Sequence, residues 1–348
     1  MRAVSSQSMS SGAFAMRQVT GDGYGHLGSV ARLPKPTNTA RANAPPMEKL
    51  ERYEPLVKDF DAFLEACRRS LPSVVRVNTI KTTPERAKAA LDEEDVGWTD
   101  REWSETVLEL DTDSPGRTWA SYHGLIHGQE EVSAIPAEVL APESGEVVWD
   151  ACAAPGSKTT QLAALMDDEG LVVANDNDLG RLSALRFNTE RLGVTNTAVR
   201  NTDSRNFSLK PFDFDGFDKA LVDVPCSCEG TIRKNPTTLD EWTMEHVRSV
   251  AGVQKGILRR AVQATEEGGT VVYSTCTFAP EENEAVLDHV LDVEDCRLVA
   301  FDVDLESRPG VTEWEGAEYD ESVRKAKRFY PHHNDTGGFF CAKLEVEG

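Results

Sequence analysis

The chain contains no Cys-x-x-Cys pair, no apolar run near the roughly 20 residues that span a bilayer, and no Gly-x-x-x-x-Gly-Lys phosphate loop. These absences disfavour thiolate zinc sites, membrane spans and P-loop nucleotide chemistry. Seven cysteines, an odd number in 348 residues, disfavour a disulfide framework. The N-terminus lacks the basic and then apolar pattern of a secretory signal. We therefore expect a cytoplasmic monomer with no metal and no membrane partner.

Positive charge is scarce, because 37 Lys and Arg stand against 59 Asp and Glu, giving a net charge of −22. A nucleic-acid partner usually requires a basic surface, and this chain on average repels polyanions. Either the partner is not a nucleic acid, or the acidity adapts a whole proteome to high salt. The acidic residues are spread along the chain rather than gathered in one tail, which favours the second interpretation and a salt-loving archaeon as the source. At molar salt the Debye length falls to about 3 Å, so local contacts decide binding.

Three segments differ in their patterns. Residues 1–46 are rich in Ser, Gly, Ala, Asn and Pro and are predicted to be disordered. Residues 47–126 carry a helical apolar stripe up to about residue 70, a strand at 74–78 and a helix from Pro84, which predicts a small α+β domain. Residues 127–348 alternate strands and helices, which is typical of an α/β doubly wound sheet with helices on both faces.

The elements of this second domain can be placed by hydropathy. The last strand follows another strand without a helix between them, so it is predicted to be antiparallel. The predicted strands are 146–150, 171–175, 196–201, 218–223, 269–274, 297–303 and 338–345, and the predicted helices lie near 157–166, 178–192, 240–266 and 280–291.

Small residues fill the loop after the first of these strands, where a helix begins. Such a loop lets a ligand approach backbone N–H groups closely, although many turns of this kind are only tight connections. The residues of the loop are Cys152, Ala153, Ala154, Pro155, Gly156, Ser157 and Lys158.

Carboxylates follow the next two strands. Asp176 ends the second strand, where an acid can accept hydrogen bonds from two ribose hydroxyls. Its alternative role is an N-cap, but Asp178 suits that role better and would leave Asp176 free. Asp203 follows the third strand at the height expected for adenine contact, and an Asx-turn is its alternative.

Two cysteines follow the fourth and fifth strands. Cys226 comes after Asp223-Val224-Pro225, and Cys276 lies in Ser274-Thr275-Cys276-Thr277. Ligands of open α/β sheets bind outside the carboxyl ends of the strands, so both thiols are expected to face one crevice. The remaining cysteines outside the loops are expected to be small buried hydrophobes, namely Cys67, Cys296 and Cys341.

From about residue 47 to the end, the chain resembles the Sun (RsmB/Nop) family of RNA cytosine-5 methyltransferases. The paired cysteine motifs carry most of this likeness. The matching segments are 150–159 (DACAAPGSKT), 223–227 (DVPCS), 274–277 (STCT), 76–79 (RVNT), 230–236 (GTIRKNP), 328–333 (RFYPHH) and 337–340 (GGFF).

The resemblance implies a class I methyltransferase domain that binds S-adenosylmethionine in the loop at 152–158. It places Asp176 at the ribose, Asp203 near the adenine and Asp223 beside the methionine part. It makes Cys276 the nucleophile that adds to C6 of cytosine, which is needed because C5 is a poor nucleophile before that addition. It gives Cys226 a part in releasing the product, as a base or through a water. Lys158 and Asp223 would stabilise the developing charge.

The resemblance also implies that the partner is RNA, either tRNA or rRNA, bound in part by the small domain. Arginines and a lysine that could hold RNA phosphates are Arg68, Arg69, Arg76, Arg233 and Lys234, with solvated surface charge as the alternative. One departure is Cys228, where the family often has glycine, and we interpret it as a tolerated substitution. A non-catalytic RNA-binding assembly factor and a DNA cytosine methyltransferase, whose nucleophile follows a proline as Cys226 does, are the alternative functions.

Overall fold

The computed structural model describes residues 45–348, so the disorder predicted for residues 1–46 lies outside the described residues except for the last two. Ala44–Gly348 form one compact unit, and the domain boundary predicted at residue 126 stays a prediction. Within residues 45–348, no helix combines the length and the apolar character that crossing a bilayer demands.

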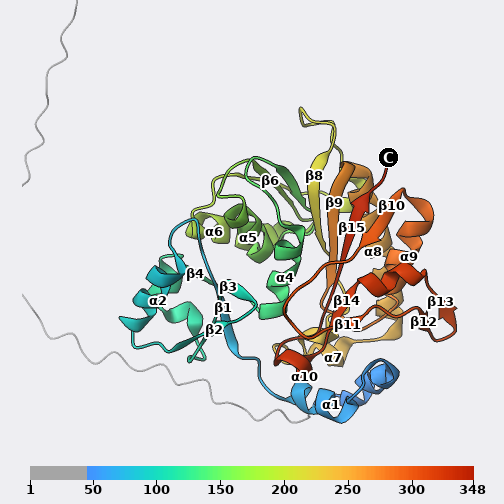
Figure 1. Ribbon diagram of the computed structural model, residues 1–348, viewed down its shortest axis with the longest axis horizontal. Coiled ribbons are helices and arrows are strands. Elements are labelled where there is room, and N and C mark those ends of the chain that lie inside the picture. Colours follow the sequence, from blue (N-terminus) through green and yellow to red (C-terminus); the bar gives the residue numbers. More distant parts are fainter. Residues whose placement is uncertain (1–44) are drawn as a thin grey trace, which may run out of the picture. The chain divides into compact units, whose positions relative to one another are not determined.

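A four-stranded antiparallel sheet, ordered β2-β3-β1-β4, builds the N-terminal part (Figure 1). The predicted strand at 74–78 is confirmed as β1. The helix predicted from Pro84 is confirmed as α2, which has proline in its first turn and Thr83 as its N-cap. The elements of this part are β1 (Ser73–Val77), α2 (Pro84–Asp92), β2 (Trp98–Arg101), β3 (Ser104–Leu110), η2 (Pro115–Arg117), α3 (Trp119–Tyr122) and β4 (Ile126–Gly128).

The helical stripe predicted over residues 47–70 is two helices rather than one, η1 (Met47–Leu56) and α1 (Phe60–Arg68). Pro55 lies at the end of η1, and Asp59 starts the second helix by accepting a hydrogen bond from Ala62 N. Both helices pack on the C-terminal part of the chain. Phe63 meets the rings of Phe278 and Tyr330 edge-on, at 5.2 and 6.2 Å between centroids.

The large sheet has nine strands, of which eight follow the order β11-β14-β15-β9-β8-β5-β6-β7, while β10 pairs with β15. Strands β7, β6, β5, β8 and β9 are parallel to their neighbours, and β15 is antiparallel to β9, as predicted. The strands are β5 (Val147–Asp150), β6 (Leu171–Asn175), β7 (Thr197–Arg200), β8 (Phe217–Asp223), β9 (Thr265–Thr275), β10 (Cys296–Val299), β11 (Arg308–Pro309), β14 (Lys327–Phe329) and β15 (Phe339–Val346).

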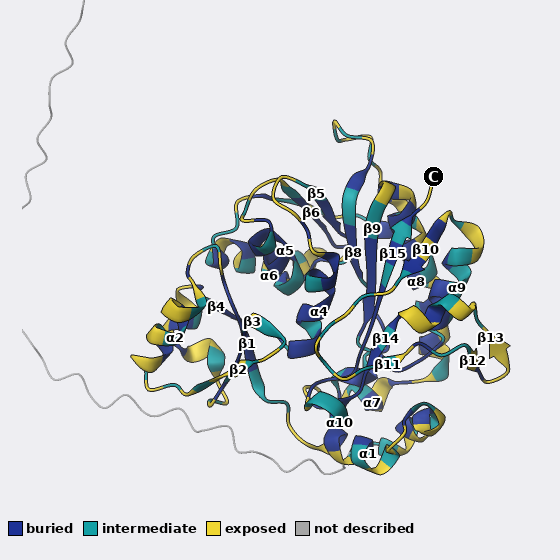
Figure 2. Cartoon of the chain, in the orientation of Figure 1, coloured by how far each residue is buried: buried dark blue, intermediate teal, exposed yellow. Residues whose placement is uncertain are grey.

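Helices cover both faces of this sheet. One core cluster joins α8 and α9 to it, and another joins α4 and α5, while the central strands stay buried between them (Figure 2). The helices are α4 (Glu131–Leu140), α5 (Ser157–Leu165), α6 (Leu179–Leu192), α7 (Thr238–Glu241), α8 (Met244–Ala264), α9 (Glu284–Val293) and α10 (Pro331–Asn334). Short elements complete the chain: η3 (Ser204–Asn206), η4 (Glu229–Thr231), β12 (Glu313–Trp314), β13 (Ala317–Glu318) and η5 (Glu321–Lys325).

The strand order reverses between β5 and β8, so the connections leaving these strands diverge there. Such a switch point is where open α/β sheets bind ligands. Two predictions about helices need correction. The last long helix begins at Glu284 rather than near residue 280, and α4 was not predicted at all.

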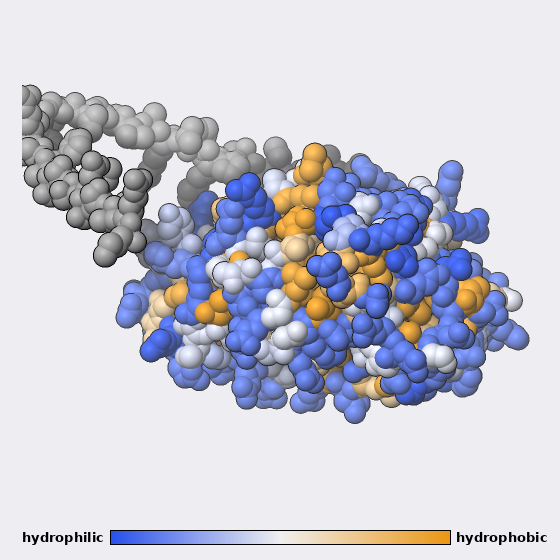
Figure 3. All heavy atoms as spheres, turned by 90° about the horizontal axis from the view of Figure 1, so that it is seen from above, coloured by the Kyte–Doolittle hydropathy of each residue, from blue (hydrophilic) through white to orange (hydrophobic). Residues whose placement is uncertain are grey.

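Hydrophilic residues cover most of the face of the molecule shown in Figure 3, with hydrophobic residues between them. This agrees with the acidic composition, because the surplus of Asp and Glu must be solvated. Anion-binding groups therefore have to be sought in particular clefts rather than over a broad basic surface.

A buried ion pair ties β14 to α9. Both guanidinium nitrogens Nε and Nη2 of Arg328 donate to Glu284, while Nη1 donates to Phe278 O at 2.9 Å, and both charged side chains are at most 2% exposed. Arg328→Met leaves the Glu284 carboxylate without its partner and is expected to lower the free energy of unfolding by about 3–5 kcal/mol in urea titrations. Arg297→Met, which breaks an exposed pair with Glu345, should cost less than about 1 kcal/mol. Equal losses in the two variants would contradict this interpretation.

Candidate active site

A cleft of about 510 Å³ opens at the switch point, outside the carboxyl ends of β5, β8 and β9. Its volume lies in the range of sites for small molecules and cofactors. It brings together most of the residues that the sequence singled out. Those that line it are Cys152, Ala153, Ala154, Pro155, Ser157, Lys158, Asp223, Cys226 and Cys276, together with Cys228 and Lys234.

The loop between β5 and α5 turns at Gly156. This residue has φ of +105°, and an added Cβ would lie 2.8 Å from a methyl carbon of Leu185, so glycine is required there. The turn starts α5 at Ser157 and puts Lys158 in its first turn. Asp150 ends β5 behind the loop and accepts a hydrogen bond from Thr159. Burial raises the pKa of Asp150 to about 7, despite that hydrogen bond.

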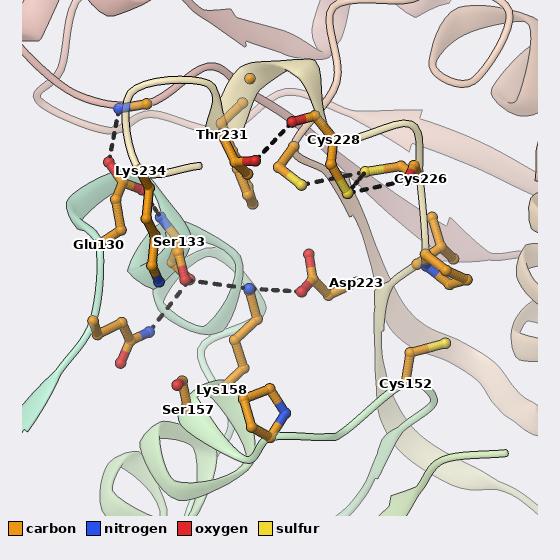
Figure 4. Close-up of a pocket in the computed structure, with 18 of the residues that line it drawn as sticks. Glu130, Ser133, Cys152, Ser157, Lys158, Asp223, Cys226, Cys228, Thr231 and Lys234 are labelled. Atoms are coloured by element: carbon orange, nitrogen blue, oxygen red, sulfur yellow. Dashed lines mark hydrogen bonds and ion pairs between the residues drawn. The ribbon is translucent and has the colours of Figure 1, made fainter. Parts of the chain in front are cut away.

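Lys158 and Asp223 form an ion pair across the cleft. Lys158 Nζ lies 2.7 Å from Asp223 Oδ2 and 3.3 Å from Ser133 Oγ (Figure 4). Ser274 Oγ donates to Asp223 Oδ1 at 2.8 Å. Burial alone would lower the pKa of Lys158, but the attraction of Asp223 outweighs it and the pKa is raised. The ammonium therefore stays charged beside the thiols.

Three cysteine sulfurs lie close together at the other side of Asp223. Cys226 Sγ is 3.3 Å from Cys276 Sγ and 3.6 Å from Cys228 Sγ. Cys152 lies away from this group, on the loop after β5 (Figure 4). The prediction that the thiols after β8 and β9 face one crevice is confirmed. Cys67, Cys296 and Cys341 are buried, also as predicted.

The three thiols differ in the direction in which their pKa values are shifted. Hydrogen bonds with Cys226 and Cys276 lower the pKa of Cys228 to about 3, against its burial. Hydrogen bonds to its two neighbours and burial raise the pKa of Cys226. A hydrogen bond with Cys226 lowers the pKa of Cys276, but Cys228 and burial outweigh it and the pKa is raised overall. Because the pKa of Cys276 is raised, its thiol must lose a proton before it can act as a nucleophile.

Two buried carboxyl groups support the loop that carries Cys226, and the sequence analysis missed both. Glu282 accepts hydrogen bonds from Ser227 N at 3.0 Å and from Gln254 Nε2 at 2.8 Å, and its other oxygen is in hydrogen-bond contact with Ser227 Oγ. Glu229 accepts from Ser227 Oγ at 2.6 Å and from the hydroxyl of Tyr53 on η1. Acids in a loop of the sequence give no sign that they are buried, so only their positions beside the cysteine motifs could have drawn attention to them.

The two carboxylates predicted for ribose and adenine lie outside the lining of the cleft. Asp176 is buried, and it accepts from Ala154 N at 3.1 Å and from Asp178 N at 2.9 Å. Asp178 caps α6 as predicted, but the inference that Asp176 is thereby left free is wrong. Asp203 accepts from Arg205 N at 3.0 Å, which is its local alternative, and it pairs with the Arg205 guanidinium. The contacts of both residues with a cofactor stay predictions.

Two of the arginines predicted to hold RNA phosphates have other partners. Arg76 is 2% exposed and donates to Gln129 and to Thr160 on α5, so it joins the small sheet to the cofactor loop. Arg233 is 6% exposed and donates to Asp335 and to three backbone carbonyls. The phosphate-binding role is wrong for both, because a buried guanidinium cannot reach RNA. Arg68 and Lys234 are exposed, and Lys234 lines the cleft.

Glu282 gives the protein a pH-dependent stability. Burial raises its pKa from 4.5 to about 8, reinforced by the nearby Glu229. Because the folded state holds this proton more tightly, its stabilisation is complete below pH about 4.5 and is lost as pH rises through about 8. Glu282→Gln is therefore expected to flatten the fall in unfolding free energy between these pH values, measured by urea titration at each pH. The exposed Glu105→Gln should keep the wild-type slope, and an unchanged slope in Glu282→Gln would contradict the assignment.

The chain is similar in sequence to known RNA methyltransferases. The family model described as 16S rRNA methyltransferase RsmB/F matches residues 137–345. A tRNA (cytosine(49)-C(5))-methyltransferase of Pyrococcus abyssi is 38% identical over 299 residues, which cover 85% of this chain and 94% of that protein. The ribosomal RNA small subunit methyltransferase F of Vibrio parahaemolyticus is 37% identical over 308 residues, or 86% of this chain. The chain spans 62% of the length of that Vibrio relative.

Solved structures agree with this result. A methyltransferase homologue from Pyrococcus horikoshii superposes with a TM-score of 0.73 at 34% identity, covering 82% of this chain and 90% of that one. NSun6 from the same organism superposes with a TM-score of 0.76 at 23% identity, covering 87% and 98% of the two chains, and supports the fold alone. With a family model over most of its length and a near full-length relative, the chain belongs to the RsmB/F, or Sun, family of methyltransferases.

Proposed function

We propose that this protein methylates C5 of cytosine in RNA and takes the methyl group from S-adenosylmethionine. The observation that carries the proposal is the 3.3 Å separation of Cys226 and Cys276 beside the Lys158–Asp223 pair in one cleft. A cytosine C5 needs a covalent partner at C6 to become nucleophilic, and a second group to take part in removing the C5 proton afterwards. Two thiols in contact supply both groups.

The residues of the cleft fit the cofactor. The loop from Cys152 to Ser157 presents small side chains and backbone, and the carboxyl groups of Asp150 and Asp223 face a site that would hold a cationic sulfonium. S-adenosylmethionine supplies an electrophilic methyl group when it is bound. The loop would hold the methionine part, while Asp176 fixes the loop by accepting from Ala154 N.

The protein's own groups then act in order. Cys276 gives up its proton to a water and its sulfur bonds to C6, so the ring electrons move to C5. Asp223 is positioned to hydrogen-bond the N3–N4 edge of the base, and Lys158 stays charged to stabilise the electrons that the ring gains. After C5 is methylated, its proton leaves to Cys226 or to a water beside it. The C6–sulfur bond then breaks and restores Cys276.

Replacing each thiol in turn tests the mechanism. Cys276→Ala removes the nucleophile and should abolish methyl transfer and form no covalent complex with RNA. Cys226→Ala blocks release and should accumulate an RNA–protein adduct, seen as a slower band on a denaturing gel. Cys296→Ala, a buried cysteine on β10, is the matched control and should behave as wild type. Adducts in Cys276→Ala but none in Cys226→Ala would reverse the two roles, as expected of a DNA-type enzyme.

We propose tRNA rather than rRNA as the substrate. The similarity to the tRNA enzyme of Pyrococcus abyssi covers 94% of that protein, whereas the rRNA enzyme of Vibrio parahaemolyticus has further length that this chain does not match. Cytoplasmic location and a monomeric state stay predictions of the sequence.

Substrate choice can be measured directly with labelled methyl donor. Unmodified tRNA transcripts are expected to gain 5-methylcytosine at least about tenfold faster than 16S rRNA, a difference of about 1.4 kcal/mol in the transition state. Methylation should be compared at molar and at low salt, because charge repulsion from this acidic protein weakens as salt rises. Preferential methylation of rRNA would overturn the substrate proposal. No methylation of either RNA by the wild-type protein would favour a non-catalytic assembly factor.

A further inference from the structure

The cleft contains a third cysteine that the proposed reaction does not use. Cys226, Cys228 and Cys276 each offer a sulfur, and all three sulfurs lie within 4.8 Å of one another. Cys226 and Cys228 come from the loop after β8, and Cys276 follows β9, so the group is formed by two neighbouring strand ends. The sequence expectation against a thiolate metal site rested on the absence of Cys-x-x-Cys and did not consider this arrangement.

The spacing of the sulfurs matches metal coordination. Zinc binds thiolate at about 2.3 Å, so two sulfurs on one tetrahedral zinc lie about 3.8 Å apart. The separations of 3.3 and 3.6 Å lie close to this value, and the third pair of sulfurs is within 4.8 Å.

The backbone at Cys228 gives an independent reason to look for a role. Cys228 has φ of +62° and ψ of 15°, the left-handed region that favours glycine. A side chain in this region is strained, because its Cβ comes close to the following carbonyl oxygen. The sulfur is nevertheless present, is directed to its neighbours, and lies 3.0 Å from Cys226 O. A strained residue that carries a reactive group into a cleft points to a function.

We propose that Cys226, Cys228 and Cys276 together bind a thiophilic cation of the zinc class. Three thiolates leave a fourth coordination position, which faces the cleft and would take a water. Thiol ligands that are protonated release their protons to solvent when the cation binds, so the bonds balance without an oxidant. Soft sulfur ligands select zinc-like ions over magnesium or calcium.

Binding of the cation to the three cysteines would regulate methyl transfer. The cation would occupy the sulfur of Cys276 that attacks cytosine, so it would inhibit methyl transfer reversibly. This consequence rests on the proposed function, whereas the site itself rests on the sulfur geometry alone. The experiment therefore measures binding without RNA and without methyl donor.

Zinc titration followed by calorimetry on the full chain, kept reduced with a phosphine, should show one ion bound per chain. Cobalt(II) should bind at the same place and produce a sulfur-to-metal charge-transfer band. Cys228→Gly and Cys228→Ser remove one ligand and should weaken zinc binding about 100-fold or more. Cys296→Ala, with a cysteine removed far from the cluster in the sheet, should bind zinc as wild type does.

Folding of the variants can be separated from metal binding. Cys228→Gly relieves the left-handed strain, so its midpoint of thermal unfolding without metal should equal or exceed that of wild type. A loss of zinc binding in that variant would then report the missing sulfur, which supports the proposal.

Other outcomes would overturn it. They are a wild-type protein that binds no stoichiometric zinc, a Cys228→Gly variant that binds zinc as tightly as wild type, or a cobalt complex without the charge-transfer band. The proposal would also be wrong if the reduced protein bound no zinc and two of the cysteines formed a disulfide under mild oxidant. That result would indicate a redox-active cysteine pair instead of a metal site. If the protein bound zinc but methylated no RNA, the proposed function would be contradicted and the zinc site would be supported.

Discussion

The register between β8 and β9 is the constraint on which the site depends. These strands are parallel, with Asp223 opposite Ser274, and Val224 N donates to Ser274 O just beyond them. The same register brings Ser274 Oγ to the Asp223 carboxylate. Because both chains leave the sheet at one level, Cys226 and Cys276 arrive in contact although 50 residues separate them. A slip of the pairing by one residue would turn one of the thiols to the other face of the sheet.

A polar layer behind the thiols holds this arrangement in place. Ser227 is bound by Glu229 and Glu282, and Gln254 from α8 donates both to Glu282 and to Pro225 O. In a medium of low polarity such bonds are strong only while every partner is present. The loop of Cys226 is therefore fixed from beneath, and its sulfur can stay in a strained and crowded group without drifting away.

The strands of the large sheet, and their alternation with helices, could be predicted from the sequence. Strands of a parallel sheet that is buried on both faces appear as short apolar runs, such as Val147–Asp150 and Leu171–Asn175. The motifs at the strand ends then located the cleft. Burial of charged groups was not predictable. Arg76 and Arg233 were predicted to be cations for RNA, yet tertiary contacts bury them, and Glu282 is fully buried as well. The sequence pattern of one element does not show which residues of a distant element will contact it. For the same reason the sequence did not predict that Asp176 accepts a hydrogen bond from Ala154 N.

The hydroxyl of Tyr53 has one consequence for how this enzyme is handled. It reaches from η1, near the beginning of the described chain, to Glu229 in the loop that carries the thiols. Tyr53 and Phe63 also fill the aromatic core around Phe278, two residues after Cys276. The helices η1 and α1 thus support the loops that carry Cys226 and Cys276. Truncating the chain from its N-terminus past these helices would remove these contacts. The buried side of the loop that carries Cys226 would then be exposed to solvent.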